Sequence, residues 1–493
     1  MLELLLHVGL LAAFSVYYAF QCTAGTFGTL VWRTEYYNLA AEGFRLGQLA
    51  LPVTPHPMLL AQPNPYDPAL RTLWLWDAIL WQGRYFIYWG PVPALCLLAW
   101  KTLAGYADKV VDQWLVLAFM LGRLYAGAGL IWSLARQANR PAPVWASALA
   151  VSVFALASPT PFVMVRPLIY EACIAAGQCF LFMGLLAAFW SVRTRSVWLA
   201  VLAGLAWSCA FNSRVTWLPV APLLAATCAW FWYRSGARSV RNGVKALAAF
   251  GVPVGLGLAA AGAYNYARFG SPTDFGVAHQ LTGRPFTSDP RFALPNLYSY
   301  LFAEMDWSCT FPFVQVSVNR VLPGFITWPP DYDLGGWLLG ERVSGLFVTV
   351  PFCYLAFGLL LRPLWNGWLR LHGLPGIRVH MLSRAQACLA VCALACLPSL
   401  LPALGGYTAS MRYLEDASGA AVLFACIVGF RWIRAPERVL RWSGRAAFTL
   451  LALFSIAVGV GLGFSGFVGN FQRENPVLHY KLVQSLSMCQ RLP

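Results

Sequence analysis

Charged side chains are scarce in this sequence, and acidic ones are the scarcest. Asp, Glu, Lys and Arg together make up 11% of the 493 residues, and only 19 residues are Asp or Glu. Soluble globular chains carry about 25% charged residues. The composition therefore excludes an ordinary soluble enzyme or binding domain.

The cysteines lack the spacing of common metal motifs. There are 13 of them, but the sequence has no Cys-x-x-Cys pair and no clustered histidines beside them. Cys388, Cys392 and Cys396 share one face of an expected helix, and we interpret them as small apolar packing groups. Cys309 and Cys489 fall in segments expected outside the membrane and are candidates for a disulfide.

Apolar residues take the place of the missing charges. They make up 59% of the chain, and its mean hydropathy is +0.59. Apolar blocks lie at 5–31, 86–104, 113–135, 142–160, 168–190, 197–211, 215–233, 246–266, 343–361, 385–405, 415–433 and 446–464. A membrane-spanning helix needs about 20 such residues, so we expect an all-α, polytopic transmembrane bundle of about 11–13 spans with external juxtamembrane helices.

The net charge of +16 does not indicate a nucleic-acid partner. No basic run is interleaved with aromatic residues for stacking on bases. Instead, basic residues gather in short segments between apolar blocks, as cytoplasmic loops require. The clusters are Arg193 and Arg195; Arg234, Arg238, Arg241 and Lys245; Arg362, Arg370, Arg378 and Arg384; and Arg431, Arg434, Arg438, Arg441 and Arg445.

These clusters set the expected topology of a single integral membrane domain, 1–493. They place a second external loop at 267–342 and an external tail at 465–493. If every early block crosses once, residues 32–85 come out cytoplasmic. Their carboxylates and aromatics nevertheless match the external segment, so we expect 32–85 to be a first external loop and one early block not to cross.

The first loop concentrates acidic residues, which membrane proteins usually place at functional surfaces. Glu35, Asn38, Glu42 and Arg45 recur at helical spacing and predict an amphipathic helix on the membrane surface. A proline-rich run follows. We expect the next helix to begin near Pro68 and to continue past Asp77.

Several segments together resemble a family. They read TEYYNLAAEGFRLGQL, YDPALR, WDAILWQGRYFIYWGPVPAL, RPLIYEACIAAG, AFNSRVTWLP, YNYARFGSPTDFGVAHQL and MRYLEDASGA. The chain resembles the GT-C membrane glycosyltransferases, and is most similar to bacterial relatives of the protein O-mannosyltransferase and aminoarabinose transferase group. The resemblance implies a polyprenyl-phosphate sugar donor and a site on the non-cytoplasmic side of the bacterial plasma membrane.

In that family a carboxylate just after the first helix, commonly within an Asp-Glu pair, lies in the catalytic centre. The matching place here reads Arg33-Thr34-Glu35, so only Glu35 carries over. We interpret Glu35 as the base that takes the acceptor proton, with a solvated helix face as the alternative. Asp77, among Trp and Tyr residues, is the second candidate; the same aromatics also fit a membrane-interface belt.

Cationic groups must hold the phosphate that departs, and the planar fork of Arg suits this task. Arg166, Arg214 and Arg412 all fall on the external side, where Arg is less expected, and we interpret them as substrate ligands. Three neighbouring residues join them as candidate substrate-binding groups: Asp67, Tyr170 and Glu171. The alternatives are a helix cap for Asp67 and the structural ion pairs Arg166–Glu171 and Arg412–Asp416.

No spacing in the sequence demands a cofactor or a metal. A divalent ion could be held by Glu35 with Asp77 or Asp274, but we predict none. His279 is isolated, which favours a structural role. The glycine-rich run 461–469 lies in an apolar helix with no preceding strand, so it indicates close helix packing rather than nucleotide binding.

Together these features predict an inverting glycosyltransferase that uses a carboxylate base. It would move a sugar from a polyprenyl-phosphate donor to a glycan, lipid or protein acceptor at the outer face, in contact with membrane lipid. A transporter or flippase for a lipid-linked glycan is the alternative of another class. An inactive scaffold that kept only the GT-C plan is the third.

Overall fold

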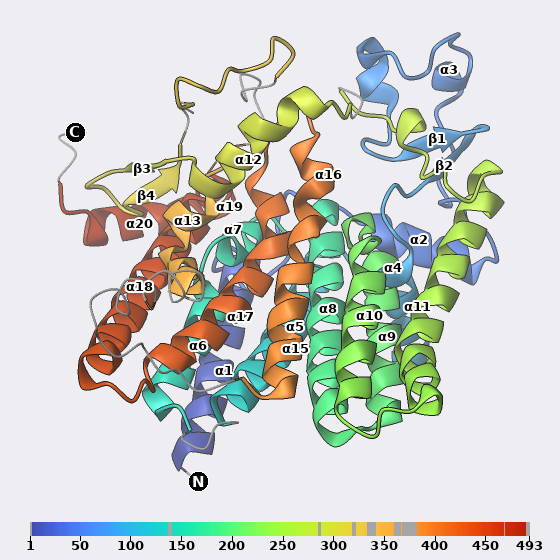
Figure 1. Cartoon of the computed structure of the whole chain (residues 1–493). Helices are drawn as coiled ribbons and strands as arrows, with labels where there is room; N and C mark the ends of the chain where they lie inside the picture. Colours follow the sequence, from blue (N-terminus) through green and yellow to red (C-terminus); the bar gives the residue numbers. More distant parts are fainter. Residues whose placement is uncertain are drawn as a thin grey trace.

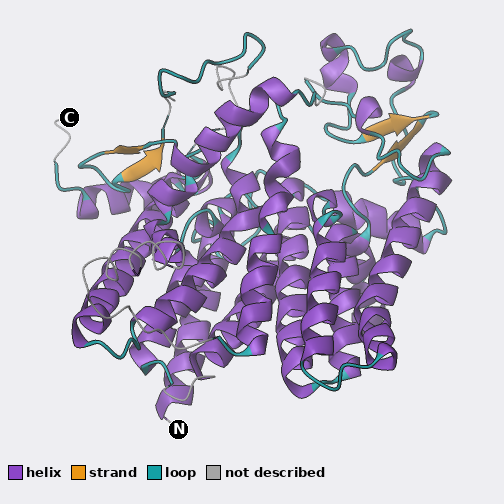
Figure 2. Cartoon of the chain, in the orientation of Figure 1, coloured by secondary structure: helices purple, strands orange, loops and turns teal. Residues whose placement is uncertain are grey.

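The structure is a computed structural model that describes residues 2–136, 141–283, 287–317, 322–332, 342–358, 366, 382–467 and 469–489. Helices dominate these residues (Figure 2). The described strands form two small antiparallel hairpins. One pairs β1 (Ile79–Trp81) with β2 (Arg84–Phe86), and the other pairs β3 (Met305–Trp307) with β4 (Val314–Val316).

Eight helical segments in the described residues are long and apolar enough to cross a membrane. They contain α1 (Leu2–Cys22), α5 (Asp112–Arg136), α8 (Ile169–Thr194), α10 (Val220–Arg234), α11 (Val240–Phe269), α15 (Arg384–Ala395) with α16 (Leu401–Leu404), α17 (Glu415–Trp432) and α18 (Arg438–Ser465). Three shorter apolar helices accompany them: α4 (Val92–Ala104), α6 (Val144–Leu156) and α9 (Val197–Phe211). The chain is therefore a multi-pass, all-helical membrane protein, which confirms the fold class that the composition predicts.

The long helices run side by side, and their ends form two unlike faces (Figure 1). The N-terminus of α1 and the short turns after α8, α10 and α17 lie at the lower end of the view. We call this end the basic face, because helix ends there carry Arg136, Arg193, Arg195, Arg234, Arg238, Arg241, Lys245, Arg431, Arg434, Arg438, Arg441 and Arg445. Three members of the third predicted basic cluster, Arg362, Arg370 and Arg378, lie outside the described residues.

The opposite end is the loop face, formed by the described residues of 23–111, 270–317 and 466–489 (Figure 1). Cys309 and Cys489 form a disulfide there, as the sequence allowed. Disulfides belong to oxidising compartments, and basic residues favour the cytoplasmic side. Both rules assign the loop face to the non-cytoplasmic side.

Helix α4, in the early apolar block 86–104, is short and is bound to the first loop. Its 13 residues reach only about 20 Å, less than the hydrocarbon thickness of a bilayer. Its Lys101 Nζ donates to Asn38 Oδ1 at 3.1 Å and to Glu42 Oε1 at 2.9 Å. Both acceptors lie on α2 (Tyr36–Arg45), the amphipathic helix of the first loop. The apolar helix of block 86–104 is therefore tied by hydrogen bonds to the surface helix α2.

The two external segments meet across more than two hundred residues of sequence. The backbone N–H of Asp77 donates to Leu281 O at 2.9 Å, and the N–H of Leu281 donates to Ala78 O at 2.9 Å. A further bridge pairs Ile79 with Gln280. Residues 32–85 and the start of 267–342 therefore build one surface, as expected.

The prediction of a helix from Pro68 past Asp77 was wrong. Only a short 3-10 helix, η1 (Pro68–Leu73), forms, and the β1–β2 hairpin follows. Asp77, Gln82 and Gly83 have φ angles of 63°, 48° and 71°, values that an α-helix does not allow. β-Branched and aromatic residues such as Ile79 and Tyr85 favour the strands that form instead.

Candidate active site

Asp77 occupies an unusual backbone conformation on the loop face. Its φ of 63° lies in the left-handed region, which few residues other than glycine adopt. The surroundings fix this geometry, since its N–H bonds to Leu281 O. The preceding carbonyl, of Trp76, accepts from the hydroxyl of Tyr36. Such unusual backbone conformations are common at functional sites, where the surrounding contacts hold them in place.

Gln280 connects Asp77 to the first turn of α8. Its Nε2 donates to Asp77 Oδ1 at 3.4 Å and to the hydroxyl of Tyr170 at 3.2 Å. The ring of Tyr170 packs edge-on against Trp89, with 4.9 Å between ring centres. One amide thus orients a carboxylate and a phenol from two distant parts of the chain.

Arg412 completes this group from the segment before α17. Its guanidinium carbon lies 4.3 Å from the centre of the Tyr170 ring. A guanidinium nitrogen of Arg412 lies 3.7 Å from Glu171 Oε1, and the two side chains are 9% and 3% exposed. We call Asp77, Tyr170, Glu171, Gln280 and Arg412 the loop-face cluster.

A second cation lies beside the cluster. The guanidinium carbons of Arg214 and Arg412 are each 5.5 Å from the centre of the Tyr413 ring, so the two cations flank one aromatic side chain. Arg214 Nε donates to Asp416 Oδ2 at 2.7 Å. Tyr88 lies nearby, and burial raises its pKa to about 12, so its phenol is neutral at physiological pH. The arrangement concentrates positive charge at an aromatic, mostly buried site.

The ion pairs in the structure differ from those that the sequence offered as alternatives to substrate binding. Arg412 contacts Glu171 rather than Asp416, and Asp416 bonds to Arg214. The reason is geometric: Arg412 precedes α17 by three residues, while Asp416 lies in its first turn and is directed toward Arg214 and Thr216. Sequence spacing alone could not distinguish these partners.

Arg166 lies apart from Glu171, on the other side of α8's start. Its guanidinium carbon is 4.3 Å from the centre of the Phe467 ring. Its Nη1 is buried, without a hydrogen-bond partner among the described residues. A cavity of about 70 Å³ adjoins Phe467 and is also lined by Phe162 and Arg342. Arg342 lines this small space on the loop face, and Arg166 contacts one of its walls through Phe467.

The other predicted residues lie outside the cluster. Glu35 precedes α2 and pairs with Lys109 at 3.2 Å, with side chains that are 37% and 72% exposed. Asp67 accepts from Ala69 N at 2.9 Å and so caps η1. Asp274 accepts from Gly276 N at 2.7 Å. In the described part of the chain, no three carboxylate, His or Cys groups on this face are close enough together to hold one metal ion.

His279 makes the contacts of a structural residue. Its ring packs 4.3 Å from the Trp81 ring, centre to centre, and its Nδ1 lies 3.3 Å from the hydroxyl of Tyr66. These contacts fasten the second external segment onto the first. They leave Gln280, its neighbour, in position for Asp77 and Tyr170.

Sequence reasoning missed several polar residues. Gln280 directly follows His279, and the sequence pattern did not indicate a functional role for it. Arg123 lies in the middle of α5 and pairs with Glu415 at 2.9 Å, with side chains that are 1% and 0% exposed. A lone Arg inside an apolar block is the signal that could have found this pair, because such a residue needs a buried partner.

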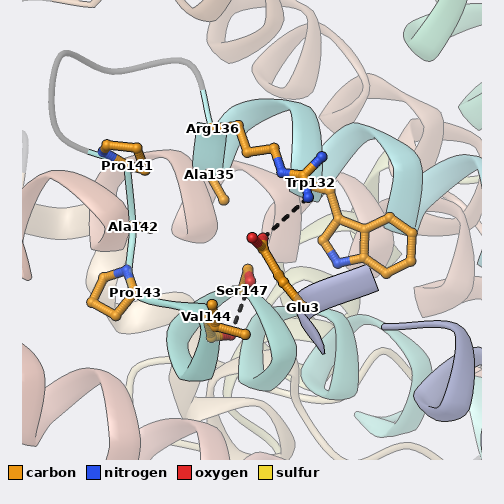
Figure 3. A pocket seen from close by; sticks show the side chains of 9 residues that line it. All are labelled: Glu3, Trp132, Ala135, Arg136, Pro141, Ala142, Pro143, Val144 and Ser147. Carbon is orange, nitrogen blue, oxygen red and sulfur yellow. Dashed lines mark hydrogen bonds and ion pairs between the residues drawn. The ribbon is translucent and has the colours of Figure 1, made fainter. Parts of the chain in front are cut away.

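A larger cavity lies on the basic face, away from the cluster (Figure 3). Its volume is about 350 Å³, and Glu3, Trp132, Arg136 and Ser147 contribute to its lining. Glu3 and Arg136 form an ion pair of 3.3 Å across it. Its position between the starts of α1 and α6 and the end of α5 separates it from the carboxylate and cations of the loop face.

No family model and no curated protein sequence matches the chain. Among solved structures, it is similar to the oligosaccharyltransferase of Archaeoglobus fulgidus. The crystal structure tethered with an acceptor peptide containing the NVT sequon has a TM-score of 0.41 and 11% identity, over 99% of this chain and 59% of that chain. The apo form has a TM-score of 0.41 and 10% identity, over 99% and 60%.

The third similar structure is archaeal oligosaccharyltransferase AglB from Archaeoglobus fulgidus, in complex with an inhibitory peptide and a dolichol-phosphate. It has a TM-score of 0.41 and 10% identity, over 95% of this chain and 56% of that chain. The chain spans about three fifths of the length of these proteins.

Proposed function

We propose that the chain transfers a sugar from a polyprenyl-phosphate donor to a hydroxyl-bearing acceptor at the loop face. The observation that carries this proposal is that Tyr170 has Arg412 over its ring and is linked through Gln280 to Asp77. A carboxylate and a cation at one site match the two charges that the reaction develops. The resemblance of the sequence to GT-C glycosyltransferases supplies the reaction type.

Asp77 acts as the base in this proposal. The acceptor oxygen attacks the anomeric carbon of the donor sugar and transfers its proton to the Asp77 carboxylate. The bond between that carbon and the phosphate oxygen breaks, and polyprenyl phosphate leaves. One displacement inverts the anomeric configuration.

Arg412 and Arg214 hold the phosphate of the donor and stabilise the charge that it gains on leaving. The guanidinium fork binds two phosphate oxygens, and the low exposure of both side chains strengthens the attraction. Glu171 and Asp416 keep the two guanidinium groups oriented before substrate arrives. Arg166 remains a proposed ligand for a more distant part of the donor.

Glu35 is the rival base, because it is the residue that the family resemblance carries over. Its ion pair with exposed Lys109 places it at the rim of α2, whereas Asp77 contacts the cluster directly. The geometry therefore favours Asp77. The activities of the matched variants Asp77→Asn and Glu35→Gln distinguish which of the two carboxylates is the base.

The function is tested with purified protein in detergent and a panel of polyprenyl-phosphate monosaccharides. The expected result is release of polyprenyl phosphate from one donor, with product of inverted configuration when a glycan, lipid or peptide acceptor is added. Release that is independent of acceptor identifies hydrolysis by water at the same site. Failure to consume any donor in the panel, with an intact fold, counts against the proposal.

One specific observation favours the alternative function of a transporter. The Arg123–Glu415 pair lies about 16 Å along α5 from its loop-face end, which places charge inside the bundle. Thr160 Oγ1 donates to Glu415 at 3.0 Å, and Gln178 Nε2 donates to its carbonyl at 2.6 Å. A fluorescent lipid-linked glycan in proteoliposomes distinguishes the two: net flipping without sugar transfer would favour the transporter.

A further inference from the structure

Three thiols converge inside the bundle, far along the helices from the loop-face cluster. Cys228 of α10 has its Sγ 3.7 Å from Cys388 Sγ and 3.5 Å from Cys392 Sγ, both on α15. All three sulfur atoms lie within 4.8 Å of one another. The residues are 0%, 2% and 1% exposed.

The convergence needs two helices, so the spacing of the cysteines along the chain does not reveal it. Cys388 and Cys392 are four residues apart and occupy one face of α15. Cys228 faces them from a helix that precedes them by about 160 residues. The other buried free cysteines, such as Cys353 and Cys426, belong to no such group within the described residues.

The sulfur positions fit coordination of a single ion. Metal–thiolate bonds are about 2.3 Å long, so three sulfurs around one ion in a plane lie about 4 Å apart. The measured separations of 3.5 and 3.7 Å require shifts of only a few tenths of an ångström. Three thiols packed only as apolar groups have no need of this mutual approach.

We propose that Cys228, Cys388 and Cys392 bind one Cu(I) ion. Thiolates select soft ions, and three sulfur ligands satisfy Cu(I), whereas structural zinc takes four ligands. Charge supports the same choice. A monovalent ion that displaces one thiol proton to water leaves the site neutral, which suits a position inside a bilayer.

The site is reached from the basic face. Cys388 lies four residues after Arg384, the first residue of α15, which is about 6 Å along the helix. Arg384 belongs to the end of the bundle that the positive-inside rule assigns to the cytoplasm. Reduced copper in the cytoplasm is therefore the form that meets these thiols.

The test uses the full-length protein, purified under reductant and free of metal, and titrated with Cu(I) presented by a chromophoric chelator. The wild type is expected to withdraw one equivalent of Cu(I) from the chelator. X-ray absorption of the loaded protein is expected to show sulfur neighbours alone around copper. Cys228→Ala and Cys392→Ala are expected to lose this equivalent, while Cys426→Ala, an equally buried thiol outside the group, retains it.

Three results would overturn the proposal. The first is a wild type that leaves all Cu(I) with the chelator. The second is copper bound through nitrogen or oxygen, which wild-type absorption spectra reveal even if a variant does not fold. The third concerns protein purified without reductant. If it contains a Cys228–Cys392 disulfide, and if no copper binds there after reductant and Cu(I) are added, the proposal is wrong.

Discussion

The guanidinium carbon of Arg412 lies 4.3 Å above the centre of the Tyr170 ring. The hydroxyl of the same tyrosine accepts a hydrogen bond from Gln280, which also donates to Asp77. One phenol thus has a cation over its ring and a carboxylate linked to its hydroxyl through Gln280. This relationship joins four segments that are widely separated in sequence.

Replacing Arg412 should weaken donor binding. Charge-assisted hydrogen bonds contribute about 1.5–3 kcal/mol, so we expect Arg412→Ala to lower affinity for a polyprenyl-phosphate sugar about 10- to 100-fold. Equilibrium binding of a fluorescent donor to the purified variant measures this. Arg291→Ala is the matched control, because Arg291 lies on the same face but is 61% exposed and paired with Asp289. Equal affinity in Arg412→Ala and wild type would remove Arg412 as a phosphate ligand.

Gln280 should affect turnover more than binding. We expect Gln280→Leu to lower kcat about 10-fold or more with little change in donor KM, because misplacing a catalytic group by a fraction of an ångström slows reaction without removing phosphate contacts. Steady-state kinetics separate the two parameters. Gln484→Leu provides the control, since it removes a similar Gln–Tyr hydrogen bond, to Tyr480, in the exposed tail. A change confined to KM would assign Gln280 to substrate binding instead.

The Arg123–Glu415 pair should show strong coupling in stability. Removing one partner leaves an uncompensated buried charge, so Arg123→Leu is expected to destabilise the fold by about 3–5 kcal/mol. The double variant Arg123→Leu/Glu415→Leu should recover most of this loss. Thermal unfolding in detergent measures both. Additive losses in the double variant would show that the two residues act independently.

The contact between α2 and α4 should depend on pH. A hydrogen bond from Lys101 is the main cause that lowers the pKa of Glu42. Because the folded value is below the ordinary one of about 4.3, the stabilisation is complete above that pH and is lost as pH falls through the folded value. Wild type should therefore melt at a higher temperature than Glu42→Gln at neutral pH, and the gap should close on acidification. A gap that persists unchanged at low pH would contradict this assignment.

The sequence was sufficient for the features that depend on composition. Long apolar blocks predicted a multi-pass helical bundle, and acidic and aromatic content suggested the pairing of 32–85 with the segment after 267 that the backbone hydrogen bonds show. These properties follow from local residue type, because the hydrophobicity and charge of each segment determine whether it enters the bilayer.

The sequence was not sufficient for features that depend on contacts between distant segments. The ion pair between Arg412 and Glu171 was not among the alternatives, because these residues are about 240 positions apart in the sequence. Gln280 was not predicted as a site residue, because the role of its side-chain amide is evident only when its two hydrogen-bond acceptors are known. The third thiol, Cys228, reaches the other two only after α10 and α15 pack together. Each case requires tertiary structure.

The most direct test of the proposed site is the rate of sugar transfer by Asp77→Asn. This change keeps the shape of the side chain and removes its ability to accept a proton. The variant is measured beside Glu35→Gln and beside Asp289→Asn, a half-buried aspartate of the same face paired with Arg291. We expect Asp77→Asn to lose at least about 100-fold in kcat, as loss of a general base does, while donor binding and melting temperature stay near wild type. Near-normal turnover in Asp77→Asn, with loss in Glu35→Gln, would contradict the assignment and move the base to α2.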